Sequence, residues 1–334
     1  MMTTVHKIKE SLKRKTKQSL ETIRSPRFKF SVMNKTKQTT LSITRGFIIF
    51  GLCFIILYPI LQMFVAAITN LRDLNDPLVV WLPRSISFET IRISSSAIDF
   101  FEAIKNTFLM ALGVMFITVT TTSLAGYAFA RLRFKGINIL FIFVVLTIVV
   151  PPQTIAMPLF MIFNFFKLTS TFWPLFLLSA TGMGIKAGIF IFIFNQVFRN
   201  LPKELEEAAI VDGCGVFRTF FNVMLPNAKP AIVTVMLFSF VWQWNDVFYS
   251  QLLISTQDMD LLSLNIVEIA PRLTYTLYKL GIDQTIAEGM SRNPLVVGTI
   301  ANTAALLMLF PLLIGYLFVQ RLFVESVERV GITG

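Results

Sequence analysis

Charged residues are scarce in this chain. Asp, Glu, Lys and Arg make up 15% of the 334 residues, whereas hydrophobic residues make up 54% and the mean hydropathy is +0.69. A soluble protein usually carries about 25% charged residues, so this chain has too few to cover a water-facing surface. The composition therefore indicates a membrane protein and excludes most soluble classes.

Histidine and cysteine are nearly absent. The one histidine, His6, lies in a basic segment, which excludes a His-based catalytic triad and a metal site built from several histidines. The two cysteines, Cys53 and Cys214, cannot form a disulfide framework. We therefore expect neither a catalytic residue set nor a metal site.

The chain contains several long apolar stretches. A helix needs about 20 apolar residues to cross a bilayer, and six stretches qualify: residues 46–69, 107–130, 137–163, 172–198, 231–255 and 295–320. The first is too long for a cleaved signal peptide, and five more follow it. The sequence predicts an all-α polytopic membrane protein with six transmembrane helices.

The basic residues show which loops face the cytoplasm. Alternate segments, beginning with the leader, hold 21 of the 30 Lys and Arg residues, and the other set holds eight. Because basic residues accumulate on the cytoplasmic side, both termini are predicted to be cytoplasmic. The formal net charge of +11 is then mainly a topology signal, and we expect no nucleic-acid partner.

The basic leader, residues 1–45, precedes the predicted transmembrane domain of residues 46–334. Val5, Ile8 and Leu12 line one side of a possible short helix among lysines, which would lie on anionic lipid headgroups. The alternative is a partly disordered tail that only fixes orientation. Both interpretations are compatible with the sequence.

Polar residues within the second and third stretches are more numerous than a lipid-facing helix requires. The second stretch contains Thr118, Thr120, Thr121, Thr122 and Ser123, and the third contains Pro151, Pro152 and Pro158. These hydroxyls either bond to their own helix backbone or line a cavity, and taken as a set they favour a cavity. The prolines predict bends.

Two ionisable residues lie inside predicted spans, Lys186 in the fourth and Asp246 in the fifth. Such residues are expensive in a membrane and are functional candidates by default. Asp246 ends the run Trp242, Gln243, Trp244, Asn245, Asp246, whose aromatic and polar groups suit a sugar. This predicts a substrate pathway, with a structural Lys186–Asp246 pair or an interfacial Trp belt as the alternatives.

The cytoplasmic loop of residues 199–229 predicts a helix, a turn and a second helix. Pro202 fits a first helical turn, and Glu204, Glu206 and Glu207 follow near the positive end of the helix dipole. Gly213 supplies a position without a Cβ where the chain can turn. On physical grounds alone, the loop is either a docking element or a self-packed one.

The same loop resembles a known motif. Glu207-Ala208-Ala209, then Gly213, and later Leu225-Pro226 at fixed spacing resemble the EAA signature of ABC importer permeases, with Val223 in place of the usual Ile. Ala125 to Arg131, together with Trp244-Asn245-Asp246, resembles the smaller six-span subunit of maltose-type carbohydrate permeases. The resemblance covers roughly residues 46–334 and does not extend to the leader.

The resemblance implies a type I ABC importer permease fold and a set of partners. These are a second permease subunit, two copies of a cytoplasmic ATPase, an extracytoplasmic solute-binding protein, a sugar substrate and membrane lipid. The coupling residues it implies are Glu207, Ala208, Ala209, Gly213, Leu225 and Pro226. An outer loop, residues 256–294, would reach the binding protein, and the tail, residues 321–334, would insert between the ATPase subunits unless it is a frayed end.

The chain lacks a Gly-x-x-x-x-Gly-Lys-Ser/Thr phosphate loop. We therefore expect a transport subunit that is not itself an enzyme and binds no cofactor, with ATP and Mg²⁺ held by the partner ATPase. Two other functions remain open at this point. An ion-coupled secondary transporter would use Asp246 with Lys186 as its coupling site, and a non-transporting sensor or scaffold would have little use for polar span interiors.

Overall fold

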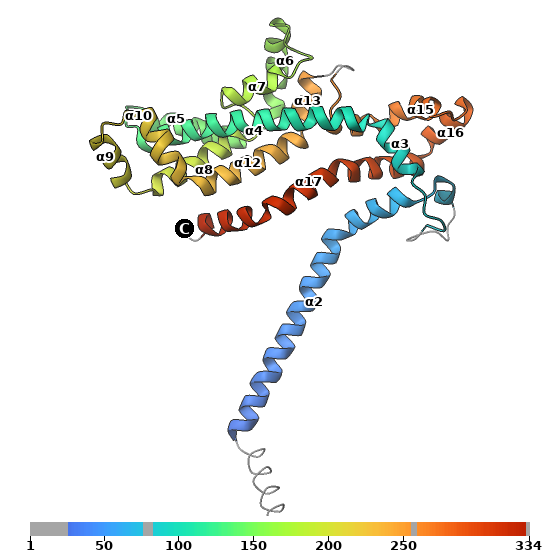
Figure 1. The fold of residues 1–334 in the computed structure, drawn as a ribbon, viewed down its shortest axis with the longest axis horizontal. Coiled ribbons are helices and arrows are strands. Elements are labelled where there is room, and N and C mark those ends of the chain that lie inside the picture. Colours follow the sequence, from blue (N-terminus) through green and yellow to red (C-terminus); the bar gives the residue numbers. More distant parts are fainter. Residues whose placement is uncertain (1–25, 76–82, 255–258, 332–334) are drawn as a thin grey trace, which may run out of the picture. The chain divides into compact units, whose positions relative to one another are not determined.

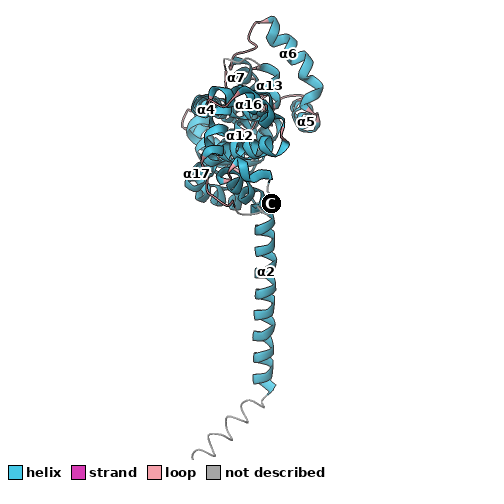
Figure 2. Cartoon of the chain, turned by 90° about the vertical axis from the view of Figure 1, so that its right-hand side faces the viewer, coloured by secondary structure: helices cyan, strands magenta, loops and turns pink. Residues whose placement is uncertain are grey.

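The computed structural model describes residues 26–75, 83–254 and 259–331. In these ranges the chain is helical and contains no β-strand; one isolated antiparallel bridge joins Thr69 and Ile86 (Figure 2). The predicted all-α class is confirmed for this part of the chain.

Two compact units make up the chain, one ending at Gln62 and the other beginning at Met63. This division falls inside helix α2 (Pro26–Ile68) and not at the predicted boundary after residue 45. Residues 26–45 of the leader are helical, which the interpretation of a disordered tail did not anticipate. The possible lipid-bound helix at Val5, Ile8 and Leu12 lies outside the described residues.

The second unit contains many helices of unequal length. After α2 they are η1 (Leu71–Asn75), α3 (Glu89–Ala97), α4 (Phe100–Arg131), α5 (Ile137–Val149), η2 (Pro152–Ile155), α6 (Ala156–Phe165), α7 (Trp173–Ala180), α8 (Ala187–Asn200), α9 (Glu204–Val211), α10 (Val216–Thr219), the π-helical turn η3 (Phe220–Met224), α11 (Leu225–Asn227), α12 (Lys229–Trp244), α13 (Phe248–Leu253), α14 (Leu262–Val267), α15 (Ile269–Lys279), α16 (Gln284–Arg292) and α17 (Pro294–Gly331).

Helix α4 is the centre of this unit. It packs along α8 and α12, and α12 packs in turn on α17 (Figure 1). Gly126 permits the contact with α8, since a Cβ at this position would lie 2.5 Å from the Cβ of Phe194. Any side chain here would separate the two helices, because packed interiors have no room for added methyl groups.

The two predicted loop systems lie at opposite ends of the second unit. Helices α9 and α10, from the predicted cytoplasmic loop, lie at one end, and α15 and α16, from the predicted outer loop, lie at the other (Figure 1). The outer loop of residues 256–294 is thus largely helical in its described part. It packs through the buried side chains of Leu273, Leu277 and Ala287.

Three helices in the described residues are long and apolar enough to cross a membrane: Lys37–Ile68 within α2, α4, and Pro294–Arg321 within α17. Two bent helix pairs, if each forms one span, raise this number to five. One of these pairs is α5 with η2 and α6, bent by 104°. The bend follows Val149, where Pro151 and Pro152 were predicted to produce it.

The stretches predicted at residues 137–163, 172–198 and 231–255 are therefore not single continuous helices. The second of them breaks between α7 and α8, where Gly182 and Lys186 have positive φ angles of 70° and 57°. The third breaks between α12 and α13, at residues 245–247. Hydropathy alone detects apolar length and cannot detect such turns, which depend on backbone conformation.

Candidate coupling surface and substrate path

Helix α9 ends at the turn that the sequence predicts, but it begins at Glu204, so Pro202 precedes the helix and does not lie in its first turn as predicted. Its first turn carries Glu204, Glu206 and Glu207, whose charges complement the helix dipole. At its end the N–H of Gly213 donates to the carbonyl of Ile210, and the N–H of Cys214 donates to the carbonyl of Ala209, both at 2.9 Å. This pair of bonds is a Schellman motif. Gly213 has a φ of +76°, which glycine adopts without strain.

Glu206 fixes α9 to the end of α4. Its Oε1 accepts a hydrogen bond of 2.7 Å from the hydroxyl of Tyr127, and its Oε2 lies 3.7 Å from Nε of Arg131. Arg131, whose side chain is 6% exposed, also donates to the carbonyl of Leu201 just before α9. Tyr127 and Arg131 of α4 therefore hold Glu206, and with it the start of α9, in place.

The sequence motifs indicated part of this contact. Tyr127 and Arg131 are four residues apart and so lie on one face of α4, within the segment that resembles sugar permeases. The EAA resemblance singled out Glu207, but nothing in the local pattern indicated which of the three acids of the first turn would contact α4. The contact joins residues 79 positions apart, and only the folded chain brings them together.

The exposed side of α9 and α10 is apolar. The large exposed hydrophobic side chains here are Ile210, Val211, Val216, Phe217 and Phe221, and those of Val211 and Phe217 are 87% and 73% exposed. We call this set the apolar tip. An exposed apolar cluster with polar neighbours marks an interaction site, so this end of the unit has the character of a docking surface.

The six predicted coupling residues lie in or beside the tip. Glu207, Ala208, Gly213 and Pro226 are exposed, Leu225 is half-buried and Ala209 is buried. Glu207 therefore faces outward, in contrast to Glu206, which faces α4. The two adjacent glutamates differ in environment, although the helical pattern alone does not separate them.

The predicted substrate-path residues surround the break between α12 and α13. Trp242 stacks between Phe190 and Phe238, with ring centroids 5.4 and 5.5 Å away, while Trp244 is buried and donates to the carbonyl of Met308. Trp244 thus packs inside the unit, whereas Trp242 is half-buried.

Asp246 acts as a cap on α13. Its carboxylate accepts hydrogen bonds from the backbone N–H groups of Tyr249 and Ser250 and from the hydroxyl of Ser250, at 2.8 to 3.2 Å. Within the described residues no ion pair joins Asp246 to Lys186, which is exposed in the turn before α8. The structural Lys186–Asp246 pair, which was one of the alternatives, is therefore not formed in this structure.

Gln243 is the candidate with unused hydrogen-bonding capacity. Its side chain is 2% exposed, and its Nε2 has no hydrogen-bond partner among the described residues. Ser239, one turn earlier on α12, is also buried with a hydroxyl that lacks a partner there. Asn245 is exposed, and its amide donates to the carbonyl of Val241. Buried polar groups without partners are rare, so α12 retains polar capacity for a ligand or water.

Four of the five hydroxyl groups that the sequence pattern singled out in α4 bond to their own helix. Those of Thr120, Thr121, Thr122 and Ser123 donate to carbonyls three or four residues earlier. Such bonds satisfy hydroxyls inside an apolar helix. Hydrogen bonding within the helix therefore accounts for these residues. The expected cavity is not needed to explain them.

Removal of the Glu206 carboxylate should loosen α9. We expect Glu206→Ala to lower the free energy of unfolding by about 1–3 kcal/mol, because it leaves the buried Arg131 without its charged partner. The measurement is thermal unfolding in detergent together with hydrogen exchange of the α9 amides. Glu204→Ala, at an exposed acid of the same turn, is the control. Equal α9 protection in both variants would contradict the role of Glu206.

Comparisons with known proteins agree with this architecture. The arabinooligosaccharides transport system permease protein AraQ of Halalkalibacterium halodurans is 25% identical over 286 residues, which cover 85% of this chain and 93% of that protein. The osmoprotective compounds uptake permease protein GgtD of Synechocystis is 32% identical over 212 residues, 60% of this chain and 68% of that protein. A crystal structure of a bacterial ABC transporter that imports the acidic polysaccharide alginate matches with a TM-score of 0.66 at 20% identity, covering 85% of this chain and 97% of that chain.

A family model matches residues 122–329, which is more than half of the chain. The matched segment begins inside α4 and ends inside α17, so it includes the loop of residues 199–229 and the described part of residues 256–294. Its description is the inner membrane component of a binding-protein-dependent transport system. The resemblance to ABC importer permeases is thereby confirmed, and the chain belongs to the family of binding-protein-dependent transport system inner membrane components, the membrane-embedded permease subunits of ABC transporters.

Proposed function

We propose that this chain forms half of the translocation pathway of an ATP-driven importer for a sugar or oligosaccharide. The observation that carries the proposal is the apolar tip on α9 and α10, held to the pathway helix α4 by Glu206. Several relatives are named as permeases for oligosaccharides, such as the arabinooligosaccharide protein AraQ. An ion-coupled secondary transporter is disfavoured, because it would have no use for a docking surface of this kind.

The proposal includes six crossings with both termini in the cytoplasm. The distribution of basic residues supports this sidedness, as does the separation of α9 and α15 to opposite ends of the unit. The spans of residues 137–163, 172–198 and 231–255 would cross as broken helices. Broken helices are tolerated in membranes where neighbouring protein groups satisfy the freed backbone.

The partners follow from the same proposal. The transmembrane domain, residues 46–334, would pair with a second permease subunit and rest on two ATPase copies, which hold ATP and Mg²⁺. This chain would bind no cofactor and no nucleic acid, and lipid would surround its spans. Helix α17 extends to Gly331, so the tail from residue 321 would approach the ATPase subunits as a helix.

Coupling would act through rigid contact. The apolar tip and the outward-facing Glu207 would sit in a cleft of the ATPase, which moves as nucleotide is bound and hydrolysed. Because Glu206 ties α9 to Tyr127 and Arg131, a displacement of the tip would pull directly on the end of α4. Coupling of this type needs a packed mechanical connection, which these contacts supply.

Reversal of the charge at Glu207 tests the coupling surface. We expect Glu207→Lys to abolish ATPase co-purification and sugar uptake while the protein remains inserted, because the exposed side chain lies on the docking side of α9. Gly213→Leu should act similarly, since leucine is strained at a φ of +76°. Glu89→Lys makes the same change in the first turn of α3 and should leave co-purification intact. Normal co-purification and uptake in Glu207→Lys would refute the assignment.

The outer hairpin of α15 and α16 is the proposed contact for the solute-binding protein. Tyr275 and Tyr278 on α15 are 70% and 61% exposed, and tyrosines are frequent in protein interfaces. Arg272 on the same helix lies within 4 Å of carboxylate oxygens of Asp260 and Glu268, which fixes the base of the hairpin. Deletion of the loop would also remove core side chains, so substitution of the two tyrosines is the sharper experiment.

Loss of both tyrosines should weaken the response to the binding protein. We expect Tyr275→Ala/Tyr278→Ala to reduce stimulation of ATPase activity by the loaded binding protein at least about tenfold, as removal of interface hot spots commonly does. Basal ATPase activity should not change. Tyr316→Ala removes an exposed tyrosine of α17 and serves as the matched control. Unchanged stimulation in the double variant would disprove the contact.

The solute path is proposed along α12 and the turn after it, at Trp242, Gln243, Asn245 and Asp246, with Lys186 contributed by the fourth predicted span. The partnerless amide of Gln243 supports this, because a sugar hydroxyl is a suitable acceptor for it. Tight binding is not wanted, since a solute held strongly within the path would not leave. Individual contacts should therefore be weak.

Replacement of Gln243 separates a solute contact from a structural role. We expect Gln243→Met to change the uptake rate about fivefold, the equivalent of one neutral hydrogen bond, while the melting temperature is unchanged or higher because a partnerless buried amide is removed. Gln251→Met changes an exposed glutamine of α13 and is the control. A large fall in melting temperature with unaltered uptake per folded molecule would show that Gln243 is structural.

A further inference from the structure

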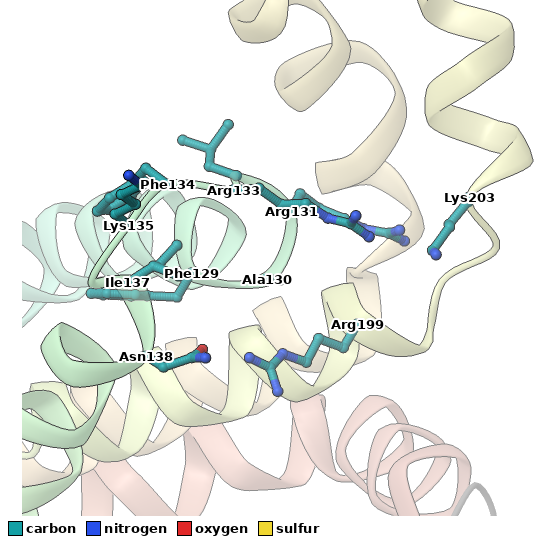
Figure 3. Close-up of a pocket in the computed structure, with 11 residues that line it drawn as sticks. Phe129, Ala130, Arg131, Arg133, Phe134, Lys135, Ile137, Asn138, Arg199 and Lys203 are labelled. Atoms are coloured by element: carbon teal, nitrogen blue, oxygen red, sulfur yellow. The ribbon is translucent and has the colours of Figure 1, made fainter.

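A basic cavity lies at the end of α4 that faces α9. Its volume is about 770 Å³, and it is bounded by the turn between α4 and α5 and by the segment that joins α8 to α9 (Figure 3). Five of its eleven lining residues are cationic: Arg131, Arg133, Lys135, Arg199 and Lys203. No acidic side chain lines it.

The positive charge in the cavity is largely uncompensated. Arg131 is bound to Glu206, but no ion pair to the other four cations is found within the described residues. In Figure 3 the side chains of Arg131 and Lys203 point toward one another from two different segments. Like charges that converge in this way repel, and a bound anion would relieve the repulsion.

The first turn of α5 adds to this field. The helix starts at Ile137 after Gly136, and both Ile137 and Asn138 line the cavity. The N–H groups of a first turn have no acceptor within their own helix, and together with the helix dipole they favour an anion. Cationic side chains and a helix start thus meet at one cavity.

Exposed apolar side chains continue from the cavity along α5. The large exposed hydrophobic residues in the turns that follow are Ile139, Leu140, Ile142 and Phe143. A free inorganic anion would not use such a surface, whereas a ligand with a charged head and a hydrocarbon chain would use both. The chemistry therefore favours an amphipathic anion.

We propose that this cavity binds the phosphate headgroup of an anionic phospholipid, with its acyl chains along α5. The proposal rests on the membrane orientation given above, which places the cavity at the cytoplasmic interface, and it does not depend on the transported solute. Basic pockets between transmembrane helices are suited to such headgroups. Since Arg131 both lines the cavity and holds Glu206, a bound headgroup would stabilise the end of α4 to which α9 is attached.

The test compares lipid retention by the complete transporter. The complex is placed in phosphatidylcholine nanodiscs that contain a minor fraction of phosphatidylglycerol, and retained lipids are counted by native mass spectrometry. We expect the wild type to retain phosphatidylglycerol selectively. Arg133→Gln/Lys135→Gln should bind it about 25-fold more weakly, because these two residues line the cavity and each would contribute roughly a fivefold factor to binding of the headgroup held there. Both side chains are exposed, so the variant should fold normally.

The control is Lys37→Gln/Arg45→Gln, which removes two exposed cations from the same predicted side of the membrane. It should retain phosphatidylglycerol as the wild type does. Equal retention by the wild type and the cavity variant would overturn the proposal. Displacement of the lipid by inorganic phosphate at equal concentration would assign a free-anion site and also overturn it, as would cross-linking of Lys135 to the ATPase without lipid retention.

The result of the lipid-retention experiment does not depend on the result of the Glu207→Lys experiment. Lipid retention is measured without transport or ATP hydrolysis, so a transporter that fails in coupling can still retain the lipid. If Glu207→Lys lost the ATPase and the nanodisc complex kept phosphatidylglycerol, the lipid site would stand as a property of the permease itself. If the cavity variant lost the lipid and kept the ATPase, the two surfaces would be shown to act separately.

Discussion

The contact of Glu206 with Tyr127 and Arg131 is the constraint on which the position of α9 depends. A short helix of eight residues such as α9 has little stability of its own. The exposed side chains of the apolar tip bury no surface that would stabilise the helix. The contacts of α9 with α4 must therefore fix its position. The half-buried carboxylate and the nearly buried guanidinium provide this fixed point. The tip can then remain exposed for a partner without loss of the helix.

Where the apolar stretches break, the backbone polar groups that leave the helix need hydrogen-bond partners within the protein. Between α12 and α13 the chain leaves the helix, and Asp246 supplies acceptors for the freed N–H groups of Tyr249 and Ser250. Its own backbone carbonyl accepts from the hydroxyl of Ser263. Where water is scarce, such bonds must come from the protein. A carboxylate that appears in the sequence as a costly charge thus stabilises a turn inside the fold.

The sequence predicted features that depend on local rules and missed those that depend on distant contacts. The turn of α9 at Gly213 and the bend at Pro151 follow from helix capping and from proline geometry, so the pattern identified both of them. The different environments of Glu206 and Glu207 arise from α4, which the local pattern does not contain. The role of Asp246 had a local indication, since Ser250 lies four residues later, but a charged residue in an apolar stretch first suggests a ligand or an ion pair.

Arg131 takes part both in the contact with Glu206 and in the lining of the basic cavity, and this position has an energetic consequence. A guanidinium has five donors. That of Arg131 contacts Glu206 and the carbonyl of Leu201, and Arg131 also lines the cavity. An anion in the cavity would compete for the charge of Arg131 but would also neutralise Arg133, Lys135 and Lys203, whose repulsion acts on the same end of α4. Removal of that repulsion allows Arg131 to stay close to Glu206. Occupancy of the cavity and the attachment of α9 are therefore expected to support one another, because both require α4 to end in the same position.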